Sequence, residues 1–403
     1  MDKLYWVYPE FSNRMEYVLE LWNTQIYSPK LIYSPNIPKN SQFILYENSK
    51  EFHAIPNSGF LLSNKTNFDF CKVDEQLEYP NFDFFSYVFA MATECYHYVP
   101  DFPKDFYGRY DERFNPVIIH QINEKPFFPF WANKICNFLK IPIQYYPKEP
   151  LWITLDIDNP FYFQYRGFYR QLKSFAKSLL KLNFRELIYK LKIITGFEKD
   201  PFHSDNWLNI VKNHQFLVFF LMNNQKYHSN TSPKNPFYIQ EILKIPPEKT
   251  GIHFSLNNHV ESKKMFTEKN YLENIVNQKI TKSRQHFLHY EVPTTFHQLL
   301  ELGIEQDYTT CFYSKKGYKH GFVRPFRWYN LLNEEATNLL RYPVFFMDRH
   351  ALKESMNYQE TIEYIENQIN IIQNYGGIPI ILFHNETFSG IMDWKSYDFR
   401  NYF

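Results

Sequence analysis

The chain has 403 residues, of which 44% are hydrophobic and 22% are charged, and this composition is typical of a soluble globular protein. Its net charge of +1 argues against a general nucleic-acid binder, because phosphate contacts need clustered positive charge. The four cysteines form no CxxC pair, which excludes a zinc-finger pattern and fits a reducing cytoplasm. We find no signal-peptide pattern and no apolar stretch of ~18 residues that could span a membrane. We therefore expect a cytoplasmic protein.

The first part of the chain, residues 1–147, predicts a small α+β domain of unknown role. Short apolar runs at 41–46 and 58–63 predict strands, and the longer apolar segment at 82–98 predicts a helix. Residues 142–150 contain three prolines in nine positions, which favours an extended connection and a domain boundary.

Residues 148–403 show a different pattern, in which short apolar runs end in side chains that can bind or catalyse. These run ends carry Asp156, Asp158, Asn223, Asn224, His253, Arg284, His286, Asp348 and His384. Helical segments intervene, and the clearest, at 358–377, places isoleucines on one face. Strands that alternate with helices predict a parallel sheet, and a β/α barrel collects functional groups at the carboxyl ends of its strands. For any single residue, the simpler explanation is that it begins a polar loop.

Two of these residues, Asp156 and Asp158, are alternate residues of one apolar strand and therefore point to the same side. One carboxylate can bind a metal ion while the other takes a proton from bound water. His253 and His286 can complete a set of three protein ligands, as catalytic metal sites have. His384, at the end of the last predicted strand, can approach from the opposite wall as a general acid. The same residues could instead be an aspartate that caps a turn and histidines that are satisfied within the core.

Five motifs occur in a characteristic order, namely TLDID, GIHFS, SRQHF, GYKHGFVRPF and LFHNETF. Together they resemble the polysaccharide deacetylase superfamily, the NodB-homology fold, and in particular its bacterial branch with an extra N-terminal domain. Segment 82–98 and the motif YDERFNP extend the resemblance over nearly the whole chain. The resemblance implies a distorted (β/α) barrel over residues 148–403. It also implies metal-dependent removal of an N- or O-acetyl group from a sugar during cell-surface polysaccharide biosynthesis.

The resemblance also implies a role for individual residues. Asp156 matches the catalytic base, and Asp158 and His253 match metal ligands. Arg324 matches the arginine that orients the base, and His384 matches the general acid. The implied cofactor is a divalent metal ion, zinc being the expected one, and the implied partner is a carbohydrate.

The sequence departs from the family pattern at two positions. Ile157 separates two acids that are adjacent in the family, and Asn257 stands where a second metal-binding histidine is expected. We therefore predict that His286 replaces the missing ligand, with His259 and His289 as further candidates. If none of the three serves, the alternative is a catalytically inactive protein that binds carbohydrate.

Four residues at these run ends and motifs also fit a different role. Asp156 and Asp348 could form the carboxylate pair of a glycoside hydrolase on a related barrel. Arg284 could pair with a carboxylate as a structural clamp, and Arg324, which precedes Pro325, could belong to a structural turn.

A last feature is the amphipathic segment 166–181, whose apolar and basic faces are opposite each other. Its apolar face holds Phe168, Leu172, Phe175 and Leu179, and its basic face holds Arg166, Arg170, Lys173, Lys177 and Lys181. The simplest interpretation is a barrel helix with a solvated basic face. The alternative is a surface that meets anionic lipid headgroups, or the diphosphate of a lipid- or nucleotide-linked sugar.

Overall fold

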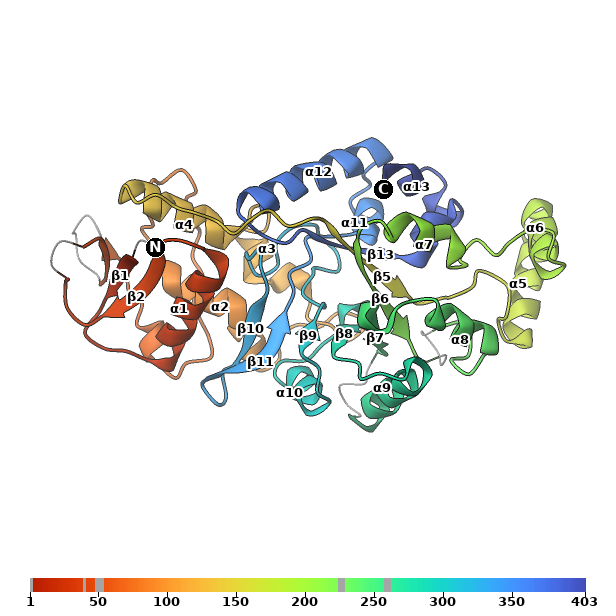
Figure 1. Cartoon of the computed structure of the whole chain (residues 1–403), viewed down its shortest axis with the longest axis horizontal. Helices are drawn as coiled ribbons and strands as arrows, with labels where there is room; N and C mark the ends of the chain where they lie inside the picture. The colour runs from red at the N-terminus through yellow and green to blue at the C-terminus, as the bar shows by residue number, and fades with distance from the viewer. Residues whose placement is uncertain (1–2, 39–40, 48–53, 224–228, 257–261) are drawn as a thin grey trace. The chain divides into compact units, whose positions relative to one another are not determined.

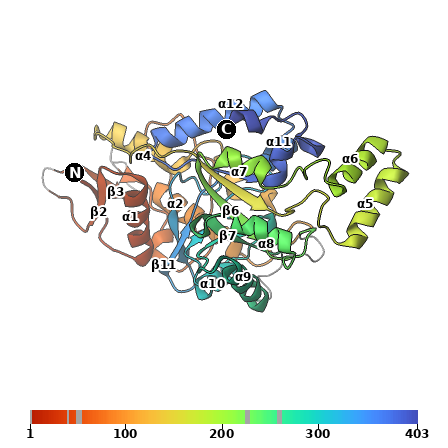
Figure 2. The ribbon, with the colours of Figure 1, turned by 45° about the vertical axis from the view of Figure 1, so that its right-hand side comes forward.

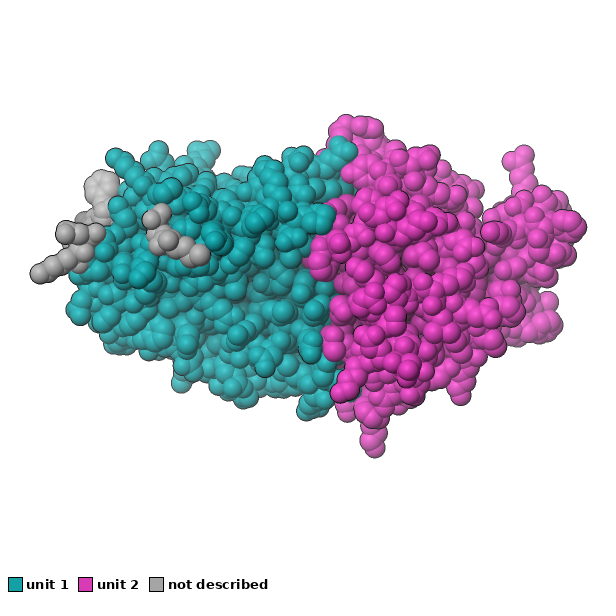
Figure 3. Space-filling view, viewed as in Figure 1, with its two compact units in different colours: residues 1–150, 288–346, 365–379 teal, residues 151–287, 347–364, 380–403 magenta. Residues whose placement is uncertain are grey.

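The computed structural model describes residues 3–38, 41–47, 54–223, 229–256 and 262–403 (Figure 1). The chain divides into two compact units (Figure 3): unit 1 comprises 1–150, 288–346 and 365–379, and unit 2 comprises 151–287, 347–364 and 380–403. The first change of unit lies close to the boundary predicted at 147/148. Residues 288–346 and 365–379, which the sequence assigned to the second domain, group with the N-terminal residues.

Unit 1 begins with a parallel sheet of strand order β2-β1-β3-β4. Its strands are β1 (Lys3–Val7), β2 (Lys30–Ser34), β3 (Phe43–Tyr46) and β4 (Ala54–Ile55). Its helices in this part are α1 (Asn13–Gln25), α2 (Phe84–Thr93), α3 (Pro116–Ile119) and α4 (Phe127–Phe138). The strand predicted at 58–63 is wrong, because Gly59 takes a left-handed conformation and Phe60–Leu62 form a 3-10 turn.

The rest of unit 1 consists of α10, β9, β10 and β11. Their bounds are Thr294–Glu301 for α10, Gln306–Asp307 for β9, Phe326–Asn330 for β10 and Glu335–Arg341 for β11. Phe312, Phe322 and Phe326 belong to the same apolar core as the N-terminal helices. This shared aromatic core explains why residues distant in sequence form one unit.

Unit 2 is built on five parallel strands in the order β8-β7-β6-β5-β13. They are β5 (Trp152–Ile157), β6 (Gln215–Leu221), β7 (Thr250–Phe254), β8 (Lys282–Gln285) and β13 (Ile380–His384). β5, β6 and β13 are mostly apolar, as expected for strands buried on both faces, whereas β8 consists of the polar residues Lys282–Gln285. The predicted α/β class with a parallel sheet is confirmed. Closure into a barrel stays a prediction, since no pairing among the described strands joins β8 to β13.

The described part of unit 2 also contains helices. They are α5 (Phe168–Leu180), α6 (Phe184–Ile194), α7 (Asp205–Val211), α8 (Pro236–Leu243), α9 (Ser262–Val276), α11 (Asp348–Lys353) and α13 (Phe399–Tyr402). In both ribbon views, α7 and α11 lie on one side of β5 and β6, and α8 and α9 lie on the other (Figure 1, Figure 2). The short strand β12 (Phe346–Met347) leads into α11, and α12 (Tyr358–Asn374) contributes residues to both units. Within the described ranges, no helix is both long and apolar enough to cross a membrane.

Candidate metal centre

The polar side chains of unit 2 gather where its parallel strands end. In the sheet register, Asp156 of β5 is opposite His384 of β13, and His253 of β7 is opposite Arg284 of β8. Because all these strands run in the same direction, their carboxyl ends meet at one edge of the sheet. The run ends at Asp156, His253, Arg284 and His384 therefore lie along one edge of the sheet, whereas Asn224 lies outside the described residues.

Three of the predicted ligands, Asp158, His253 and His286, converge on one point. One ligand atom from each lies within 4.8 Å of the others. Nε2 of His253 is 3.2 Å from Oδ1 of Asp158, and Nε2 of His286 is 3.4 Å from Oδ2 of the same carboxylate. One carboxylate and two imidazoles are a donor set that suits a divalent ion such as zinc.

The protonation of His253 provides a test of whether a cation fits. Its Nδ1 lies 3.1 Å from the backbone carbonyl oxygen of Arg284, which can only accept, so Nδ1 carries the hydrogen. In the neutral ring, Nε2 then presents a lone pair to Asp158, whose Oδ1 is buried and has no hydrogen-bond donor. Two lone pairs that face each other are favourable only with a proton or a metal ion between them. The residues present therefore fit a metal ion.

Asp156 of β5 is held by an arginine from β8, and β6 and β7 lie between these two strands in the same sheet. The Nη1 atom of Arg284 is 2.7 Å from Oδ1 of Asp156, and its Nη2 donates to Oγ1 of Thr154 at 2.8 Å. The guanidinium is fully buried and lies over the ring of Phe219, at 4.6 Å from the ring centre. The other oxygen of Asp156, Oδ2, is 3.6 Å from Nε2 of His253. Arg284 thus makes the carboxylate contact that the sequence offered as its alternative role, and it orients Asp156 toward the three-ligand cluster.

His384 is oriented by a buried carboxylate, Asp348, which binds the ring nitrogen Nδ1. Its Nδ1 is 2.9 Å from Oδ1 of Asp348, and its backbone N–H donates to Oδ2 at 2.7 Å. Thr387 donates its hydroxyl to the same carboxylate. The free ring atom Nε2 points to the cluster and is 3.7 Å from Oδ2 of Asp158. Burial lowers the pKa of His384, but the charges of Asp348 and Asp158 outweigh it, so the pKa is raised.

Sequence reasoning missed the contact that Asp348 makes with His384. Burial raises the pKa of Asp348, but the adjacent His384 imidazole and the other groups around the carboxyl together have a larger and opposite effect. The pKa is therefore below its usual value, and the carboxyl is ionised. The available signal was its position, since Asp348 ends an apolar run in the same way as His384 does. Nothing in the sequence shows that the two run ends are in contact.

Arg324 makes contacts different from those predicted. It lies in unit 1, where its Nη1 donates to the backbone oxygen of Gly376 at 2.7 Å. Its guanidinium lies over the ring of Tyr146, at 4.1 Å from the ring centre. The contact with Asp156 that the sequence predicted for Arg324 is made by Arg284 instead.

The further histidine candidates do not join the three-ligand cluster in the described part of the chain. His289 lies in unit 1, with Nε2 3.8 Å from Oε1 of Glu291. His259 and Asn257, the position of the missing family histidine, lie outside the described residues.

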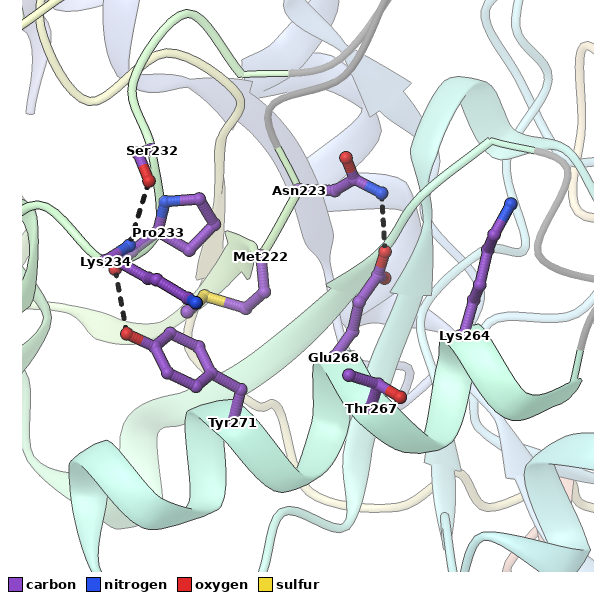
Figure 4. Close-up of a pocket in the computed structure, with 9 residues that line it drawn as sticks. All are labelled: Met222, Asn223, Ser232, Pro233, Lys234, Lys264, Thr267, Glu268 and Tyr271. Atoms are coloured by element: carbon purple, nitrogen blue, oxygen red, sulfur yellow. Dashed lines mark hydrogen bonds between the residues drawn. The ribbon is translucent and has the colours of Figure 1, made fainter.

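A pocket of about 340 Å³ opens beside the ends of β6 and β7 (Figure 4). Asn223 follows β6, and Glu268 and Tyr271 lie on α9 across from it. Glu268 accepts from the Asn223 side chain at 3.0 Å and from the backbone N–H of Ser255 at 3.1 Å. Ser255 is two residues after His253, so the pocket lies along the same edge of the sheet as the three-ligand cluster.

Comparison with known proteins does not assign a family. No family model matches the chain, and no curated protein matches it. Among solved structures, the chain is similar to one described as a "putative polysaccharide deacetylase from Mycobacterium smegmatis". The two share 14% identity at a TM-score of 0.38, over 65% of this chain and 85% of the other.

Proposed function

We propose that the protein is a metal-dependent carbohydrate deacetylase that removes an N- or O-acetyl group from a sugar. One observation carries the proposal: Asp158, His253 and His286 converge, with the carboxylate of Asp156 and the imidazole of His384 directed at them. A ligand trio flanked by a proton acceptor and a proton donor is what metal-assisted acyl transfer to water requires.

The roles of the side chains follow from their partners. A bound divalent ion would lower the pKa of water from about 15.7 to about 7 and would polarise the acetyl carbonyl. Asp156, oriented by Arg284, would accept the proton of the attacking water. His384, protonated with the help of Asp348, would give its Nε2 proton to the departing amine or alcohol as the acyl bond breaks. The products are acetate and the deacetylated sugar.

The pocket beside the centre suits a sugar. Asn223, Ser232 and Tyr271 offer amide and hydroxyl groups, which hydrogen-bond to sugar hydroxyls without demanding a charge. The resemblance to the deacetylase superfamily suggests a role in assembly of a cell-surface polysaccharide, and the basic segment 166–181 would suit a lipid- or nucleotide-linked sugar as the substrate.

The geometry gives less support to a glycoside hydrolase or to an inactive binding protein. A glycoside hydrolase would need Asp348 free as one of its carboxylates, but Asp348 accepts hydrogen bonds from His384 and Thr387. An inactive binding protein was suggested by Asn257, but the ligand trio forms without a histidine at that position.

The test is metal analysis of the purified chain and of Asp158→Ala, together with acetate release from a panel of N- and O-acetylated sugars. We expect one zinc-class ion per wild-type chain, and loss of both metal and acetate release in Asp158→Ala. The matched control is Asp393→Ala, since Asp393 is an exposed aspartate of the same unit. Equal, near-zero metal content in wild type and Asp158→Ala would refute the proposal.

A further inference from the structure

Helices α5 and α6 form a hairpin that differs from the rest of unit 2. Both ribbon views show it projecting from the end of the unit, away from the helices that cover the sheet (Figure 1, Figure 2). The two helices contact each other, and the turn between them is short, with Asn183 capping α6. The hairpin therefore protrudes from unit 2 and has large solvent-exposed faces.

The exposed faces of the hairpin are apolar. In the described part of the chain, eleven of the twenty-three exposed large apolar side chains fall within residues 168–197. They are Phe168, Tyr169, Leu172, Leu179, Leu180, Leu182, Phe184, Ile188, Leu191, Ile194 and Phe197. Phe168, Leu180 and Phe197 are 80%, 85% and 85% exposed. Contiguous exposure of this kind marks an interaction surface, whereas single exposed apolar residues are ordinary.

The buried side chains of the hairpin are of both kinds, Ile193 being apolar and Ser178 and Lys190 polar. Lys190 is buried there, and its Nζ donates to the hydroxyl of Ser178 at 2.7 Å and pairs with Glu186 at 2.6 Å. A helix that packs on a protein core normally turns its apolar face inward. The sequence suggested a barrel helix with only its basic face in solvent, but here the apolar face is exposed as well.

The segment is also strongly basic. Residues 166–199 contain nine lysines and arginines but two glutamates, although the whole chain has a net charge of only +1. Lys173, Lys177, Lys181 and Arg185 are exposed, and none of them forms an ion pair among the described residues. On α5, Lys173 and Lys177 lie on the face opposite Phe168, Leu172 and Leu179, and both faces are exposed, so the helix is amphipathic with neither face covered.

We propose that the α5–α6 hairpin docks on an anionic membrane surface. Amphipathic helices with this combination lie in the interface, with the apolar face about 5–10 Å deep and the basic residues among the headgroups. Charge complementarity favours this occupant over a second copy of the chain, because two hairpins of the same strong positive charge repel each other. The inference does not depend on the deacetylase proposal.

Vesicle flotation of the full chain tests the inference. We expect flotation with vesicles of phosphatidylcholine and phosphatidylglycerol, and at least roughly tenfold weaker binding to phosphatidylcholine alone. Replacing Lys173, Lys177, Lys181 and Arg185 by glutamine should weaken binding to the anionic vesicles by roughly tenfold or more. The triple change Phe168→Ser, Leu180→Ser and Leu182→Ser should abolish flotation even at low salt. All of these positions are exposed, so the thermal unfolding midpoint should not change.

Matched controls use exposed residues outside the hairpin. The charge control replaces Lys72, Lys140, Lys148 and Lys395 by glutamine, and the apolar control replaces Phe106, Ile119 and Leu332 by serine. Both controls should float like the wild type. The proposal is overturned by no flotation of the wild type, by equal weakening in the controls, or by light scattering that shows a dimer which the triple change dissociates.

Discussion

Each unit contains a carboxylate surrounded by nitrogen groups, fully buried Glu94 in unit 1 and half-buried Asp158 in unit 2, but the two carboxylates differ in what neutralises them. In unit 1, Glu94 lies 2.7 Å from Nη1 of Arg341 and 3.3 Å from Nε2 of His320. In unit 2, Asp158 faces the Nε2 atoms of His253 and His286. A guanidinium is always charged, whereas an imidazole is neutral unless it binds a proton.

This difference explains why only one cluster is a candidate metal centre. The Arg341 guanidinium satisfies Glu94 from within the protein, and although burial raises the pKa of Glu94, Arg341 brings it well below its usual range. Asp158 has no permanent cation beside it among the described residues, and its Oδ1 lacks a hydrogen-bond donor. A buried carboxylate therefore does not indicate a metal site by itself. It indicates one when imidazoles face it, and not when a charged guanidinium already neutralises it.

The largest expected effect comes from removing the permanent cation. Arg341→Met removes the guanidinium closest to buried Glu94 and leaves it the longer ion pair with Lys319, at 3.7 Å, which should lower the free energy of unfolding of unit 1 by about 3–5 kcal/mol. Asp158→Asn in metal-free protein at about pH 8 should change the stability of unit 2 by less than about 1 kcal/mol, since it removes a charge without a permanent partner. Native-state hydrogen exchange measures each unit separately. Equal losses in the two variants would contradict the comparison.

The second prediction is that zinc stabilises unit 2 and not unit 1. Free zinc at about 100 times its Kd should raise the free energy of opening of unit 2 by about 2.7 kcal/mol and leave unit 1 unchanged. Asp158→Ala should abolish the increase, and Glu94→Gln should preserve it. An increase that survives Asp158→Ala but disappears in Glu94→Gln would place the ion in unit 1 instead.

The third prediction concerns His384, which lies beside Asp348, and His320, which lies beside Glu94. His384 has its pKa raised by Asp348, whereas burial lowers the pKa of His320 to about 4 despite Glu94. Asp348→Asn should therefore lower the pKa of His384 and reduce acetate release about 10–100-fold. Because the protonated ring is the proton donor, the alkaline limb of the kcat profile should move to lower pH. Asp393→Asn is the control, and an unshifted limb in Asp348→Asn would exclude His384 as the acid.

The sequence predicted the parts of the site that depend on local pattern. Asp158 and His253 lie at the ends of apolar runs, His286 follows β8, and parallel strands bring such ends to one edge. The α/β class was also predictable from local pattern, because strands and helices alternate along the chain.

What the sequence did not predict depends on which elements are neighbours. Arg284 and Asp156 are 128 residues apart in the chain and come together because the strand order places β8 and β5 in one sheet. The Asp348–His384 pair requires β12 and β13 to be adjacent. The assignment of residues 288–346 to unit 1 reflects an aromatic core that no local pattern reveals.

The smallest effect is a pH dependence that differs in sign between the units. Burial lowers the pKa of His97 to about 3 and of His320 to about 4 in unit 1. A histidine with a lowered pKa contributes stability above its unfolded value of about 6.5, and loses it as the pH falls toward the folded value. Unit 1 should therefore lose up to roughly 1.4 kcal/mol per pH unit for each of these histidines below about pH 6.5.

In metal-free unit 2 the sign is reversed for two histidines. Burial lowers the pKa of His253 and of His384, but nearby carboxylates outweigh it, so both pKa values are raised. For His286, burial is the larger effect and its pKa is lowered. A raised pKa contributes stability that is fully present below about pH 6.5 and is lost as the pH rises through the folded value. Hydrogen exchange between pH 7.5 and 5.5, corrected for the intrinsic exchange rate, should thus show unit 1 opening more easily and unit 2 no more easily. If zinc occupies the centre, it replaces those protons, so acid should then release the ion and destabilise both units.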